Sequence, residues 1–190
     1  LRLRQGDRTR AVAGVAGQSG TNDGPAALAR FYEPSGVVVD TKGNLYVADN
    51  YNHTIRRASA LGTVTTLAGM PETQGNADGN GNQARFSYPS SLAFGPDGHL
   101  YVTDSYNHRI RRVTLQGEVT TYAGSSRGSA DGPALDAQFR SPDGLAFDAV
   151  GNLGVADTGN HTLRRISLAG QDTTLAGSAG LSGVADGLGD

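Results

Sequence analysis

Short apolar runs alternate with glycine-containing turns along most of the chain. The run at residues 36–40 is continuously apolar before its final aspartate, which is typical of a buried strand. The next run alternates, with Leu45 and Val47 on one side and Tyr46 and Ala48 on the other, which predicts a second strand. The four strands predicted for this unit are GVVVD (36–40), NLYVAD (44–49), TIRRAS (54–59) and TVTTLAG (63–69).

This pattern of strands and turns repeats. The segment DNYNHTIRR, which starts at Asp49, recurs as DSYNHRIRR from Asp104 and as DTGNHTLRR from Asp157, so the copies are 55 and 53 residues apart. The same spacing applies to a proline before the first strand of each unit and to an Asp-Gly pair. The prolines are Pro34, Pro89 and Pro142, and the pairs start at Asp23, Asp78, Asp131 and Asp186. Four antiparallel strands in each unit of this length predict the blades of a β-propeller.

The repeat sets the predicted domain organisation. We expect a partial blade at residues 1–33 and blades at 34–88, 89–141 and 142–190. These are about three and a half four-stranded blades of an all-β fold, which predicts either a piece of a ring with six or more blades or several associating copies, since open blade edges invite pairing.

Composition excludes several classes of function. The chain has no cysteine, which rules out disulfides, thiolate metal sites and thiol catalysis. Its net charge of −2 provides no broad basic field, so binding to nucleic acid is not favoured. Because no apolar run approaches the 18 or so residues that span a bilayer, membrane insertion is not expected.

The repeated segment resembles the NHL-repeat family. Its signature is an Asn-His pair with an aliphatic residue two places later, and all three copies carry it together with the flanking text GNLYVAD and VTTLAG or close variants. The resemblance implies a propeller, commonly six-bladed, of the kind found in large bacterial secreted or cell-surface proteins. A secreted or cell-surface location follows as an expectation.

Residues that recur at equal spacing are interpreted as parts of the frame, because a catalytic site normally breaks the symmetry of a repeat. We expect each histidine to bind the backbone or the nearby aspartate, and each aspartate to pair with Arg57, Arg112 or Arg165. The recurring residues are Asp49, Asn52, His53, Asp104, Asn107, His108, Asp157, Asn160 and His161.

A competing hypothesis makes the chain an enzyme. Three histidines from successive blades, each near a carboxylate, could bind zinc in the central channel, and the resemblance implies a metal-dependent lyase or hydrolase as this alternative. The sequence NADGNGN at 76–82 hints at calcium but lacks the acidic density of an EF-hand loop. No cofactor is therefore predicted, with zinc or calcium as the alternatives.

Variation within the repeated segment points to a binding surface instead. The loop positions 50–51, 105–106 and 158–159 differ between units, while the residues around them barely change. The candidate ligand-binding residues are Asn50, Tyr51, Ser105, Tyr106 and Thr158. The sequence thus favours a non-catalytic interaction or scaffold module that binds a protein or other ligand, or that self-associates through open blade edges.

Overall fold

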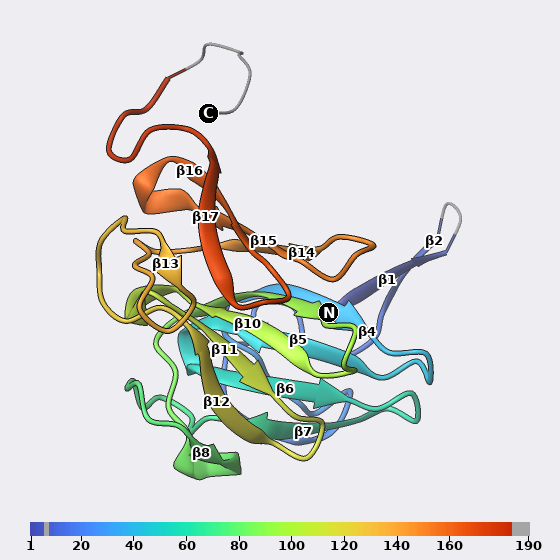
Figure 1. The fold of residues 1–190 in the computed structure, drawn as a ribbon. Helices are drawn as coiled ribbons and strands as arrows, with labels where there is room; N and C mark the ends of the chain where they lie inside the picture. Colours follow the sequence, from blue (N-terminus) through green and yellow to red (C-terminus); the bar gives the residue numbers. More distant parts are fainter. Residues whose placement is uncertain (6–7, 184–190) are drawn as a thin grey trace.

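The computed structural model describes residues 1–5 and 8–183 and confirms the all-β propeller fold (Figure 1). Three five-stranded antiparallel sheets follow one another along the chain, and a two-stranded sheet made of β1 (Arg2–Gln5) and β2 (Arg8–Ala11) precedes them. The Asp-Gly pair at 186–187 lies outside the described residues. In the part of the chain that the structure describes, no helix is long and apolar enough to cross a membrane.

The three large sheets share one strand order, with a two-residue strand at one edge and four longer strands beside it. The first sheet contains β3 (Gly24–Pro25), β4 (Pro34–Val39), β5 (Leu45–Asp49), β6 (Thr54–Ala58) and β7 (Thr63–Ala68). The second contains β8 (Gly79–Asn80), β9 (Pro89–Phe94), β10 (Leu100–Asp104), β11 (Arg109–Val113) and β12 (Glu118–Ala123). The third contains β13 (Gly132–Pro133), β14 (Gly144–Phe147), β15 (Leu153–Asp157), β16 (Thr162–Ile166) and β17 (Gln171–Ala176).

The short edge strand is an addition to the four strands predicted from the sequence. In the first sheet, Gly24 and Pro25 pair with Val64 and Thr63 of β7. The chain before each proline therefore contributes two residues to the edge of the sheet that follows. The remaining regular elements are 3-10 turns: η1 (Asn50–Asn52), η2 (Gly81–Gln83), η3 (Ser105–Asn107) and η4 (Thr158–Asn160).

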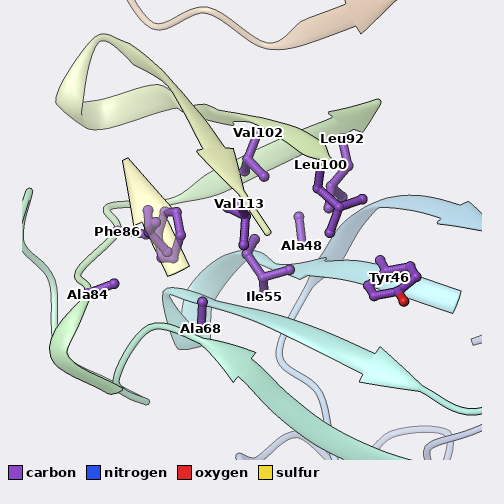
Figure 2. Close-up of a cluster of buried hydrophobic side chains, with 11 residues drawn as sticks. Tyr46, Ala48, Ile55, Ala68, Ala84, Phe86, Leu92, Leu100, Val102 and Val113 are labelled. Carbon is purple, nitrogen blue, oxygen red and sulfur yellow. The ribbon is translucent and has the colours of Figure 1, made fainter. Parts of the chain in front are cut away.

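The hydrophobic core lies in layers between successive sheets. The layer between the first and second sheets combines Ile55 of β6 with Leu100 and Val113 of the second sheet and with Phe86 from the connection (Figure 2). Phe139 occupies the corresponding place between the second and third sheets. Strands such as β5 are buried on both faces, because each sheet is covered on both sides.

In each five-stranded sheet, the pairing between the third and fourth long strands contains the same irregularity. The register shifts between Ile55 and Arg56 on the pair β6–β7, and the shift recurs in both later sheets. Just beyond it, Gly69 adopts a φ of 92°, and a Cβ on this residue would lie 2.5 Å from the carbonyl oxygen of His53. Glycine is required here because the chain leaves the sheet directly over the histidine backbone.

Among the positions where the third sheet differs from the other two, Leu163 and Asp172 change what is buried. Leu163 is 47% exposed, whereas Ile55 and Ile110 at the same position are fully buried under the following sheet. Asp172 replaces Val64 and Val119 at a buried position of the fourth strand. The third sheet therefore has one uncovered apolar face and one additional buried carboxylate.

Candidate functional site

The five candidate ligand-binding residues lie together. Asn50 and Tyr51 of η1, Ser105 and Tyr106 of η3, and Thr158 of η4 line a hollow of about 370 Å³. The three turns lie at the same end of their sheets, because each joins the second long strand to the third. We call this end the loop face; it consists of η1, η3 and η4 with residues 32–33, 87–88 and 140–141.

Four residues that the sequence did not single out complete the wall of the hollow. They are Tyr88, Ser90, Ser141 and Asp143, which flank or follow the repeated prolines. A signal for them existed in the sequence, since the position before each proline varies as Glu33, Tyr88 and Ser141 while the proline does not change.

Each 3-10 turn of the loop face is held by the aspartate that precedes it. In the second sheet, Asp104 accepts hydrogen bonds from the backbone N–H of Ser87 (2.7 Å), from the Asn107 side chain (2.8 Å) and from the Arg111 guanidinium (2.7 Å). The same three bonds form around Asp49 and Asp157. Burial raises the pKa of Asp104, and the Arg111 charge and these hydrogen bonds act against that rise.

The prediction that the aspartates pair with Arg57, Arg112 and Arg165 is wrong, because the preceding arginine is the partner in each sheet. Arg56, Arg111 and Arg164 are buried and bind Asp49, Asp104 and Asp157. Alternation along the strand explains the error, since adjacent residues point to opposite faces. Arg112, for example, instead pairs with Asp97 at the surface.

In the three copies of the repeated Asp-Gly pair that the structure describes, the aspartate has a second role beyond the turn expected from the sequence. Asp78 binds the far side of the Arg111 guanidinium at 2.5 Å and accepts bonds from the backbone and hydroxyl of Thr121. Asp23 and Asp131 do the same for Arg56 and Arg164. Each buried arginine therefore joins the third strand, the preceding turn and the fourth strand of one sheet.

The repeated histidines connect one sheet to the next. The His53 ring accepts a hydrogen bond at its Nδ1 atom from the backbone N–H of Tyr88 (3.2 Å), and the His108 ring accepts one from Ser141 (3.1 Å). Burial lowers the pKa of His53 and of His108, which favours the neutral ring that this acceptor role needs. His161 has the same backbone conformation, but its ring is exposed and has no hydrogen bond with the described residues.

Replacing His108 with alanine is expected to reduce the free energy of unfolding by about 1 kcal/mol more than replacing His161 does. The two residues share a left-handed conformation, with φ of 58° and 60°, so the backbone strain of the alanines is matched. Urea unfolding measures the difference. The difference between the two variants should shrink as pH falls below about 6.5, because the unfolded chain then binds a proton that the partly buried His108 ring, with its lowered pKa, resists. Equal losses in both variants would show that the ring contributes no bond between sheets.

The described part of the structure does not bring together the side chains that the metal hypothesis requires. Among the residues that the structure describes, no group of three or more histidines, aspartates or glutamates is arranged to hold a metal ion. The only acid in the sequence 76–82, Asp78, already uses its carboxylate on Arg111 and Thr121.

A row of four tyrosines crosses the loop face from the first sheet to the second. The ring centroids of Tyr32 and Tyr51 are 4.9 Å apart, those of Tyr51 and Tyr88 are 5.2 Å apart, and those of Tyr88 and Tyr106 are 4.6 Å apart. The His53 ring packs edge-on against Tyr88 at 4.6 Å. Tyr32, Tyr51 and Tyr106 keep 41%, 41% and 65% of their surface exposed. The row ends at the third sheet, where the corresponding residues are Arg140, Ser141 and Gly159.

The hollow next to this row has polar walls. The Asn50 side chain donates to the carbonyl of Pro89 (2.9 Å), and the Ser105 hydroxyl donates to the carbonyl of Pro142 (2.7 Å). Asp143 is exposed, and its carboxylate has no hydrogen bond with any residue in the described ranges. Outside the hollow, Glu33 raises the pKa of Tyr51 through its charge.

Comparison with known proteins supports the interpretation of the repeat. The NHL repeat model matches residues 31–57 and 86–113. The chain is 32% identical over 180 residues to Protein SUPPRESSOR OF QUENCHING 1, chloroplastic, of Arabidopsis thaliana, covering 88% of this chain and 17% of that protein. It is 33% identical over 171 residues to NHL repeat-containing protein 2 of Bos taurus, covering 82% of this chain and 24% of that protein.

A solved structure agrees with these sequence matches. An auxiliary nutrient binding protein from Bacteroides thetaiotaomicron VPI-5482 superposes with a TM-score of 0.67 and 25% identity, over 75% of this chain and 39% of that one. The chain thus spans less than half of each of these proteins. The repeated Asn-His segments, the layered sheets and these matches together place the chain in the NHL-repeat family of β-propellers.

Proposed function

We propose that this chain is a non-catalytic propeller module that captures a protein partner or other ligand on its loop face. The observation that carries the proposal is the row of four tyrosines beside a polar hollow. Exposed, contiguous aromatic side chains are typical of recognition surfaces, because each ring provides a large contact area and loses little conformational freedom on binding.

The separation between residues that stabilise the frame and residues that line the hollow supports the same function. The aspartates, histidines and buried arginines are occupied with bonds within and between sheets. The residues that vary between units instead line the hollow, and Tyr51 and Tyr106 among them stay partly exposed. A rigid frame that presents variable side chains from short turns is how many binding proteins are built.

The double variant Tyr51→Ala/Tyr106→Ala is expected to weaken ligand binding by at least about tenfold without unfolding the chain. Ligands would be selected from a random peptide library displayed on phage against the wild-type protein, and their affinities measured by calorimetry. The matched control is Leu61→Ser, since Leu61 is exposed in the β6–β7 turn at the opposite end of the first sheet. If the selected ligands bind the double variant as tightly as the wild type, the loop face is not the capture surface.

A further inference from the structure

We propose that the hollow of the loop face accepts an arginine side chain from an extended segment of a protein partner. This inference rests on the proposed function and adds the chemical identity of the ligand. It is carried by two observations: the aromatic row, and the free carboxylate that lines the hollow.

The aromatic row places partly exposed rings where an incoming cation would meet them. Tyr88 lines the hollow and contacts Tyr51, Tyr106 and His53 at centroid distances between 4.6 and 5.2 Å. Ring faces attract cations through their quadrupole, and a planar guanidinium also stacks on them. This protein already uses that contact in its core, where the guanidinium carbon of Arg111 lies 5.3 Å from the centre of the Phe86 ring.

One of the nine residues that line the hollow carries a charge, and that charge is negative. Asp143 lines it, and the nine lining residues include no lysine, arginine or histidine. Glu33 adds a second carboxylate near Tyr51. Arg140 precedes Ser141 in the chain but is not part of the lining. A cationic ligand therefore fits this charge, and an anionic one does not.

The carboxylate of Asp143 gives the hollow a partner for a guanidinium. One N–H of the Asn50 amide donates to the carbonyl of Pro89, and the Ser105 hydroxyl donates to the carbonyl of Pro142, whereas the Asp143 carboxylate is not engaged by any described residue. A guanidinium carries five donors and no acceptor, and it binds a carboxylate through two parallel bonds.

The shape of the surface favours a side chain presented by a peptide over a free small cation. The hollow of about 370 Å³ is large enough for one side chain. The tyrosine row continues from Tyr51, which lines the hollow, to Tyr32, which lies outside it. An extended segment advances about 3.3 Å per residue, so residues next to the arginine would lie along this row.

The test uses a labelled peptide, acetyl-Gly-Pro-Arg-Pro-Gly-amide, and the same peptide with citrulline, a neutral isostere, in place of arginine. Fluorescence anisotropy should show that citrulline weakens binding at least about tenfold, and that Asp143→Asn weakens binding of the arginine peptide by a similar factor. Asp136→Asn is the matched control, because Asp136 is exposed and lies outside the hollow. Binding should also weaken as salt is added.

The outcomes separate this inference from the function on which it rests. Equal binding of the citrulline peptide, or no effect of Asp143→Asn, would overturn the arginine assignment. Argininamide that binds as tightly as the peptide would overturn the extended segment. If cellohexaose or an acidic peptide binds instead, and Tyr51→Ala/Tyr106→Ala abolishes that binding, the capture function stands and the arginine assignment fails. If no probe depends on the tyrosines, both fail.

Discussion

Replacing Arg111 with methionine is expected to reduce the free energy of unfolding by about 3–5 kcal/mol, a large part of the stability of an ordinary domain. Methionine keeps the apolar length of the side chain but removes the donors that reach Asp104 at 2.7 Å and Asp78 at 2.5 Å. It also removes the bonds to the carbonyls of Arg85 and Ala77. The Asp104 carboxylate would then remain buried without its charge partner. Urea denaturation measures the loss.

The neighbouring arginine provides the control. Arg112 lies next to Arg111 on β11, but it points to the other face and pairs with the partly exposed Asp97 at 3.0 Å. Arg112→Met should cost less than about 1 kcal/mol, because surface ion pairs contribute little. If Arg111→Met does not fold, Arg111→Lys, which keeps the charge but loses the forked donors, should show an intermediate loss. Similar losses for Arg111 and Arg112 would contradict the buried network.

Replacing Asp172 with valine is expected to stabilise the protein, by about 1–3 kcal/mol at neutral pH. Valine is the residue at this position in the other two sheets, and the Arg164 guanidinium keeps Asp131 and Asp157 as partners without Asp172. Burial raises the pKa of Asp172 to about 6, and the nearby Asp131 charge adds to the rise. One carboxylate oxygen of Asp172 is buried with no hydrogen-bond partner in the structure.

The pH dependence gives this prediction a second readout. Between about pH 4 and pH 6 the folded protein holds a proton on Asp172 that the unfolded chain releases, so stability falls as pH rises through this window. Asp172→Val should remove that fall, which unfolding curves at a series of pH values would show. Asp136→Asn, at an exposed position, is the control. A variant that is less stable than the wild type at neutral pH would show that the third carboxylate stabilises Arg164.

The blades could be predicted from the sequence because their pattern is local and occurs three times. The spacing of Asp49, Asp104 and Asp157 and the strand-like runs around them determine the sheets. The partner of each aspartate could not be chosen in the same way. Two adjacent arginines are equivalent in a sequence motif, and only the direction of the strand in the folded sheet shows that Arg111 faces inward while Arg112 faces solvent.

The candidate site was partly predictable for a similar reason. Tyr51 and Tyr106 vary inside a repeated segment, so comparing the units reveals them. Tyr88 and Asp143 come from a different part of the repeat. They reach the hollow only because the chain returns to the loop face at the start of each sheet. Such a meeting of distant segments depends on the three-dimensional arrangement and leaves no spacing pattern in the sequence.

The bonds that hold the turns and join the sheets have a consequence for evolution and for engineering. The side chains of Asp104, Asn107 and His108 bind the backbone of Ser87, Gly75 and Ser141 rather than their side chains. The bonds at positions 87 and 141 therefore do not depend on the side chain there, proline excepted because it lacks the N–H group, and the left-handed φ of 47° at Ser141 disfavours β-branched residues. The frame tolerates substitution where the loop face is built, so new specificities can accumulate there while the blades stay intact.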